Sequence, residues 1–158
     1  LTQGEEKVLL TGQLGKVMQE SATAALSYLR SRFGDLDDYA EFFAGDVHIH
    51  VPAGAVPKDG PSAGIAMATV LLSLLLDRPI DRRTAMTGEI TLTGDVLAIG
   101  GLLEKVLAGH RVGIRRVIMP AANEPDLENI PDEVREAVEF VPVAHVDQVW
   151  RTVFGDDY

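Results

Sequence analysis

The chain has 158 residues, of which 46% are apolar, and a formal net charge of −10 with a pI near 4.7. This length and apolar content predict one globular domain and exclude a disordered chain. The acidity argues against nucleic acid as a partner, because phosphate binding needs clustered Lys and Arg. The absence of cysteine excludes disulfides, thiol catalysis and cysteine-based zinc sites.

The opening residues are polar and charged, so no signal peptide is predicted. The longest apolar run, about fourteen residues, is shorter than the ~18 that a membrane span requires. These features and the lack of cysteine are typical of a cytoplasmic protein. Because the chain begins with Leu1 rather than Met, we expect a fragment of a longer protein.

Apolar spacing and turn residues predict alternating strands and helices along the chain. The elements expected are a strand at 7–10, a helix at 14–33, a helical turn at 39–43, a strand at 47–51, a helix at 63–76, strands at 85–92 and 96–99, a helix at 102–111, a strand at 115–119, short helices at 125–130 and 132–137, a strand at 140–143 and a helix at 145–154. Residues 93–95 predict a hairpin, so the fold class is α/β (α+β), a mixed β-sheet with packed helices. The helix at 63–76 is apolar almost all round and is expected to be central.

Residues 57–64 combine two glycines and two prolines around one serine, Ser62, directly before the apolar helix. A serine at that boundary is typical of a helix N-cap. The same boundary suits a nucleophile, since unpaired N–H groups at a helix start can stabilise an oxyanion. The candidate donors are the backbone groups of Gly60, Pro61, Ser62 and Ala63.

Two other chemistries have weaker support. His48 and His50 lie on one face of the strand at 47–51, a spacing compatible with a shared metal, but no further ligands are evident nearby. We therefore expect strand histidines that pack or form hydrogen bonds, and no metal site. No window matches a phosphate-binding loop, which argues against an NTPase.

Residues 60–64 also fit the G-x-S-x-G pattern of α/β-hydrolases. That mechanism would require Asp126 and His145 as the remaining members of a Ser-His-Asp triad. The segment before Ser62 is a poor strand, because it is rich in proline and glycine.

A lysine can activate a serine when an apolar setting lowers the lysine pKa. Lys105 is the best candidate. Its neighbours three and four residues away on the predicted helix are uncharged, namely Gly101, Leu102, Ala108 and Gly109.

Taken together, the chain resembles the proteolytic domain of the Lon family of ATP-dependent proteases over nearly its whole length. The segments that carry the resemblance are residues 11–15 with 17–22, 48–52, 57–64, 86–90, and 100–102 with 104–105. The resemblance implies a ribosomal S5 domain 2-like fold for residues 1–158, a single domain that follows an AAA+ ATPase module in the longer protein.

The resemblance implies that Ser62 is the nucleophile and Lys105 the general base of a Ser–Lys dyad that hydrolyses peptide bonds. Thr87 matches a threonine whose hydroxyl helps to hold the lysine. His50 and Asp59 match positions that line the site, where orientation or loop shaping is expected; Asp59 also suits an ordinary turn before Gly60. An extended substrate is expected to pair with residues 52–55.

The resemblance further implies unfolded or damaged proteins as substrates, a role in protein quality control, and a hexameric ring. No cofactor is expected in this domain, whereas the absent ATPase module implies ATP and magnesium. Neither a membrane nor nucleic acid is an expected partner. The alternative is an assembly domain whose active site is latent without that module.

Overall fold

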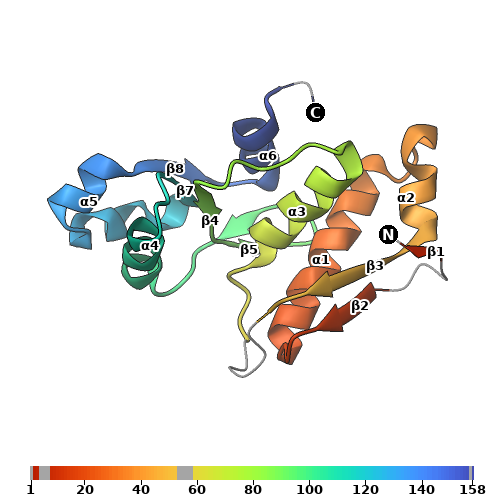
Figure 1. Ribbon diagram of the computed structural model, residues 1–158, viewed down its shortest axis with the longest axis horizontal. Coiled ribbons are helices and arrows are strands. Elements are labelled where there is room, and N and C mark those ends of the chain that lie inside the picture. Colours follow the sequence, from red (N-terminus) through yellow and green to blue (C-terminus); the bar gives the residue numbers. More distant parts are fainter. Residues whose placement is uncertain (1, 4–7, 53–58, 157) are drawn as a thin grey trace.

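The computed structural model describes residues 2–3, 8–52, 59–156 and 158 (Figure 1). Its helices are α1 (Lys16–Phe33), η1 (Asp37–Tyr39), α2 (Ala40–Ala44), α3 (Gly64–Leu76), α4 (Leu102–Arg111), η2 (Ala121–Asn129), α5 (Asp132–Ala137) and α6 (Val146–Phe154). Its strands are β1 (Thr2–Gln3), β2 (Val8–Thr11), β3 (Gly45–His50), β4 (Thr84–Met86), β5 (Glu89–Ile90), β6 (Val96–Leu97), β7 (Arg116–Pro120) and β8 (Glu139–Val143).

The described strands combine parallel and antiparallel pairing, which confirms the α/β fold class and the mixed sheet. β3 lies between β1 and β2, antiparallel to the first and parallel to the second. β7 lies between β4 and β8, and all three are parallel. β5 and β6 form the expected hairpin. Figure 1 shows α4 and α5 at one end of the molecule and α1 and α2 at the other.

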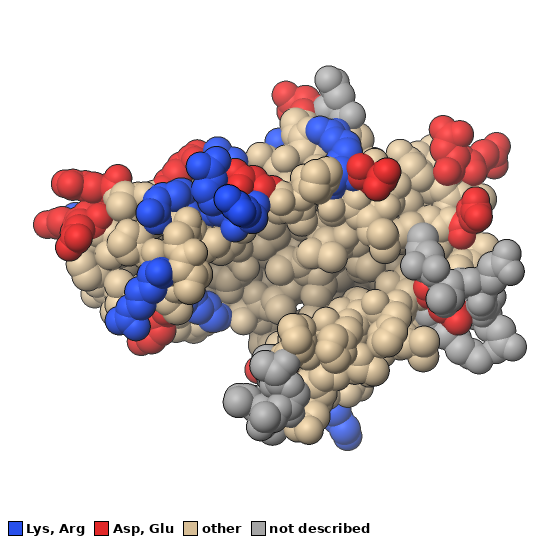
Figure 2. Space-filling model, in the orientation of Figure 1, with Lys and Arg blue, Asp and Glu red and all other residues tan. Residues whose placement is uncertain are grey.

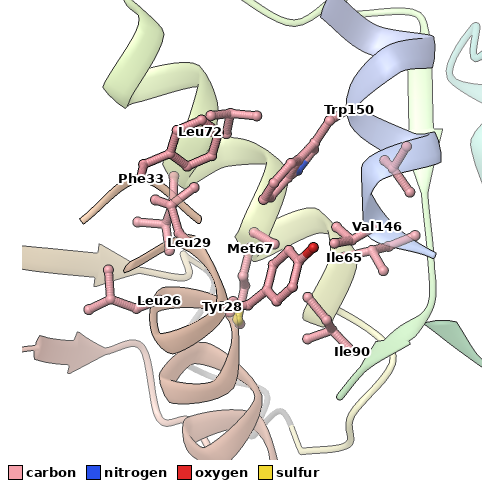
Figure 3. Close-up of a cluster of buried hydrophobic side chains, with 14 of the residues drawn as sticks. Leu26, Tyr28, Leu29, Phe33, Ile65, Met67, Leu72, Ile90, Val146 and Trp150 are labelled. Carbon is pink, nitrogen blue, oxygen red and sulfur yellow. The ribbon is translucent and has the colours of Figure 1, made fainter. Parts of the chain in front are cut away.

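The larger hydrophobic core joins α1, α3 and α6. The buried side of α1 carries Ala22, Ala25, Leu26 and Leu29, whose helical spacing keeps them on one face. Trp150 of α6 is fully buried against the rings of residues 28 and 33. Figure 3 shows buried side chains of all three helices converging, among them Leu29 of α1, Leu72 of α3 and Trp150 of α6. This core supports the N-terminal end of α3, where Ser62 enters the fold.

A smaller core lies at the other end of the molecule, beneath α4. Its buried residues come from α4, β7 and the segment that contains η2 and α5; they are Leu102, Val106, Val117, Met119, Ile130, Val134 and Val138. Because α4 carries Lys105, this second core supports the predicted base. The helices next to the two candidate catalytic residues, α3 and α4, therefore pack into different cores.

The predicted strand at 85–92 was wrong as a single element. The chain forms β4 in the parallel sheet, leaves it at Thr87 and Gly88, and then forms β5 in the hairpin. At this break the Gly88 N–H donates to the Ser62 carbonyl at 2.8 Å. A Cβ on Gly88 would lie 2.8 Å from a methyl group of Val96, so the close packing of this backbone against Val96 requires glycine. The break is set by these tertiary contacts rather than by strand propensity.

The expectation that α3 is central was only partly confirmed. Its residues facing α1 and β5 are buried, but Val70 and Leu74 are 58% and 52% exposed. Residues four apart lie on one side of a helix, so the two define an uncovered apolar strip. Composition alone does not distinguish a helix buried on all sides from one buried on most.

Candidate active site

Ser62 lies in the turn that precedes α3 and is partly buried. The N-cap of α3 is Ala63, and no side chain caps this helix. The prediction that Ser62 caps the helix was therefore wrong. Its hydroxyl is not used to begin α3, and its side chain lines a cavity instead.

The backbone of the serine turn is held from two sides. The Ser62 carbonyl accepts hydrogen bonds from the Gly88 N–H at 2.8 Å and from the Thr87 hydroxyl at 3.2 Å. The preceding carbonyl, that of Pro61, accepts from the Ser21 hydroxyl at 3.4 Å. A segment rich in glycine and proline thus acquires one defined conformation through its neighbours.

Asp59 anchors the start of this turn to α1. Its carboxylate accepts from the backbone N–H of Met18, the third residue of the helix, at 3.1 Å and from that of Gly60 at 2.9 Å. This is an N-cap supplied by another segment of the chain. The fit is close, because a Cβ on Gly15 would lie 2.2 Å from the Asp59 carboxyl carbon. Pro57 and Lys58 of the same sequence motif lie outside the described residues.

Ser62, Thr87 and Lys105 line one cavity of about 260 Å³ between α3, β4 and α4. The remaining lining residues are apolar: Ala63, Ala66, Ala85, Met86, Leu102, Val106 and Val117. Lys105 is the one charged group among these described residues. Figure 2 shows the charged side chains mainly over the left part and along the upper and right edges of the face it draws, with an uncharged area in the middle.

Lys105 projects from the first turns of α4. Burial of its side chain lowers the pKa of the Lys105 ammonium below the usual lysine value, because an apolar setting disfavours the charged form. Its Nζ donates to the carbonyl of Gly100 at 3.2 Å. A lysine with a lowered pKa beside a serine in an apolar cavity is suited to general-base chemistry.

Thr87 is buried in the same cavity, but its hydroxyl contacts a different partner from the one predicted. It donates to the Ser62 carbonyl rather than holding the lysine. Its backbone N–H donates to the Ile118 carbonyl of β7 at 3.0 Å. Thr87 therefore links the serine turn to the parallel sheet.

His50 does not line this cavity. The ring Nδ1 of His50 lies 2.7 Å from the Thr11 hydroxyl, and the Nε2 of His48 lies 2.9 Å from the same oxygen. The strand pattern predicted that both histidines lie on one face of β3, and both are exposed there. Among the described residues, no group of three or more His, Asp or Glu side chains could hold a metal ion. Residues 53–55, expected to pair with substrate, lie outside the described part of the chain.

The residues of the alternative Ser-His-Asp triad are engaged elsewhere. His145 caps α6: its Nδ1 accepts from the Asp147 N–H at 3.2 Å, so its Nε2 carries the proton and donates to the Thr93 carbonyl at 3.1 Å. Asp126 accepts from the amide of Asn123. Neither triad candidate lines the cavity with Ser62.

Sequence reasoning missed Asn123, a buried polar residue that bonds to both backbone groups of Ile99. No spacing or motif signals it, because asparagine in a loop is usually a turn residue.

A search of the described helices for membrane spans is negative, since none combines sufficient length with sufficient apolarity.

A family model described as the Lon protease (S16) C-terminal proteolytic domain matches residues 1–155 of this chain. The chain belongs to this family. It is a family of serine peptidases, and the resemblance predicted from the motifs is thereby confirmed.

Individual Lon proteases match over nearly the whole chain. That of Methanosarcina barkeri is 51% identical over 154 residues, which cover 98% of this chain and 19% of the relative. That of Brevibacillus choshinensis is 56% identical over 149 residues, and Lon protease 1 of Bacillus subtilis is 55% identical over 150 residues. Each of these two matches covers 94% of this chain and 19% of the relative. The chain thus spans 19% of the length of these curated relatives.

Proposed function

We propose that this chain hydrolyses peptide bonds with Ser62 as the nucleophile and Lys105 as the general base. The observation that carries the proposal is the shared cavity, which is lined by the serine and by one charged group, a lysine whose pKa is lowered by burial. Membership of a serine peptidase family supports the same reaction.

The reaction proceeds in two stages. Neutral Lys105 takes the hydroxyl proton of Ser62 as the oxygen attacks the peptide carbonyl carbon, forming a tetrahedral oxyanion. The protonated lysine then gives that proton to the leaving amine as the C–N bond breaks and the acyl-enzyme forms. Water attacks the ester in the second stage, with Lys105 again accepting and returning a proton, so that Ser62 and a free carboxylic acid are released.

Only some of the four residues predicted as oxyanion donors have a backbone N–H group available. Pro61 has no N–H, and the Gly60 N–H already donates to Asp59. Within the described residues, the N–H groups of Ser62 and Ala63 donate to no protein acceptor, which leaves them free for a developing oxyanion. We assign these two groups as the donors.

Thr87 and Asp59 act as positioning residues in this scheme. Thr87 holds the Ser62 carbonyl, which orients the peptide unit between Ser62 and Ala63. Asp59 fixes the beginning of the same turn on α1. His50 is assigned no part in proton transfer, because its ring bonds to Thr11 and lies outside the cavity lining.

In the longer protein, we propose that this domain is the proteolytic part of an ATP-dependent protease that degrades unfolded or damaged proteins in the cytoplasm. ATP and magnesium belong to an upstream ATPase module, and the assembly is a hexameric ring. The support is the match to Lon proteases of which this chain spans 19%. The second candidate is an assembly domain with a latent site, favoured because the hydrogen bonds of the described residues include none between the Ser62 hydroxyl and the Lys105 amine.

The test is turnover of an unstructured fluorogenic peptide by the parent chain and by Ser62→Ala, Lys105→Ala and His145→Asn. Asparagine retains an N-cap acceptor, so His145→Asn removes the imidazole without uncapping α6. We expect the first two variants to lose at least about 1,000-fold in kcat and His145→Asn to retain activity. Full activity in Lys105→Ala contradicts the dyad; no turnover by the parent at any concentration supports latency.

A further inference from the structure

The turn that precedes α4 is held by a single buried side chain. The Ile99 N–H donates to Oδ1 of Asn123 at 2.9 Å, and Nδ2 of Asn123 donates to the Ile99 carbonyl at 2.9 Å. Asn123 is only 5% exposed. Its amide therefore pairs with Ile99 as a neighbouring strand would, although it comes from η2, 24 residues further along the chain.

This turn also holds the lysine. The carbonyl of Gly100, the residue after Ile99, accepts the hydrogen bond from Nζ of Lys105 at 3.2 Å. The next residue, Gly101, is the N-cap of α4 in a left-handed conformation with φ 71°, and its carbonyl accepts from the Lys105 backbone N–H at 3.2 Å. Two successive carbonyls of the turn thus contact Lys105, and Asn123 fixes the residue directly before them.

We propose that Asn123 is a positioning residue for Lys105: by holding Ile99, it places the Gly100 carbonyl that orients the lysine amine toward Ser62. The inference rests on the proposed Ser–Lys mechanism. A neutral amine has two N–H groups and one lone pair. When one N–H is bonded to Gly100, the lone pair can point in fewer directions, and one of them is into the cavity shared with Ser62.

The carboxylates near this turn do not account for the arrangement. Glu104 in the first turn of α4 and Asp126 in η2 line a separate hollow, to which Gly100 also contributes. Asp126 accepts from Nδ2 of Asn123 at 2.6 Å. That bond fixes the amide with its oxygen toward the Ile99 N–H, but Asp126 makes no recorded bond to Ile99 or Lys105 among the described residues.

The decisive variants are Asn123→Ala and Asn123→Ser. Alanine removes both bonds to Ile99, and serine leaves a polar group in the buried space but is too short to satisfy both Ile99 groups. The matched control is Asp126→Asn, which keeps an oxygen acceptor for the Asn123 amide and leaves its two bonds to Ile99 in place.

Two measurements follow for each variant, with thermal unfolding as a check of folding. The first is kcat and KM on the fluorogenic peptide. The second is the ¹³Cε pH titration of Lys105, a readout that does not require turnover. The chain has four lysines, so selective labelling yields four signals, and Lys105→Arg identifies the relevant one.

We expect the Asn123 variants to lose about 100-fold in kcat, because misplacing a catalytic group by about 1 Å has effects of this size, while KM changes little. Without the Gly100 anchor the amine moves into water, so the Lys105 pKa rises toward its usual value of ~10.4. Asp126→Asn should leave both quantities near those of the parent.

The inference is overturned if the Asn123 variants fold, Lys105 titrates as in the parent and kcat changes by less than about twofold. Asn123 would then be a structural residue only. The lysine titration decides the matter even for a chain without turnover. Failure of the proposed function has a different signature, namely peptide turnover that persists in Ser62→Ala.

Discussion

The two sides of the proposed catalytic cavity are built differently. Ser62 enters at the N-terminal end of α3, in the larger core, and its turn is bonded through backbone groups to both α1 and the β4–β5 link. Lys105 lies on α4, which packs into the smaller core. Its amine, at the end of a four-carbon side chain, is held by a single carbonyl, that of Gly100. The proposed nucleophile is positioned by the backbone, whereas the proposed base depends on a side-chain contact and on burial. Perturbations of the base should therefore change the chemistry first, and perturbations of the serine side should change stability first.

The largest expected effect comes from pH, which titrates only the lysine side of this comparison. Burial lowers the pKa of Lys105, and only the neutral amine can accept the serine proton. Turnover should rise with pH by about tenfold per unit until the Lys105 pKa is passed, at a value below the usual ~10.4. A pH–kcat profile of the parent and of His145→Asn checks this, and both should share one midpoint. A flat rate from about pH 6 to about pH 10 contradicts the role of Lys105.

The next largest effect is expected in the larger core. Trp150 is fully buried beside Tyr28 and Phe33, so Trp150→Ala should lower the free energy of unfolding by about 3–5 kcal/mol. Chemical denaturation measures it. Trp150→Phe is the matched control: it keeps a ring and removes an indole N–H that has no partner among the described residues, so its cost should be clearly smaller. Equal losses in the two variants would show that packing of the ring is not what stabilises this core.

A smaller loss of stability, with a change in chemistry, is expected in the second core. Val106 is 2% exposed and lines the cavity that contains Ser62 and Lys105, so Val106→Ala should cost about 2 kcal/mol of unfolding free energy. The enlarged cavity also admits water beside Lys105, which should move the midpoint of the pH–kcat profile upward. Val112→Ala, at the exposed end of α4, is the control and should stay within about 0.5 kcal/mol of the parent. If Val106→Ala is destabilised but the midpoint of its pH–kcat profile is unchanged, the pKa of Lys105 does not depend on the packing of Val106.

The smallest expected effect concerns the serine turn. Asp59→Ala leaves the N–H groups of Met18 and Gly60 without their acceptor and should cost about 1 kcal/mol of unfolding free energy. Asp59→Asn keeps an acceptor oxygen and should restore most of the loss. Thermal unfolding of both variants measures the difference. If Asp59→Asn is as destabilised as Asp59→Ala, the contribution of Asp59 is its charge near the N-terminus of α1 rather than a directed hydrogen bond.

Elements with a strong local signal could be predicted from the sequence. The spacing of apolar residues predicted most of α1, and the glycines at 100 and 101 predicted the start of α4 at Leu102. The strand at 85–92 could not be predicted correctly, because it is interrupted where Gly88 bonds to Ser62, a residue 26 positions earlier. The capping prediction for Ser62 failed for a related reason: the turn is held by distant hydrogen-bond partners and has no need of the hydroxyl.

By itself the sequence determined the fold class, the family and the two residues proposed for the chemistry, because the motifs around Ser62 and Lys105 are local and specific. The tertiary structure decided how these residues are held. It placed Thr87 on the Ser62 carbonyl, Asp59 on α1 and Asn123 behind the lysine turn. These contacts join segments far apart in the chain, and no local preference of a residue encodes a partner that only folding brings near.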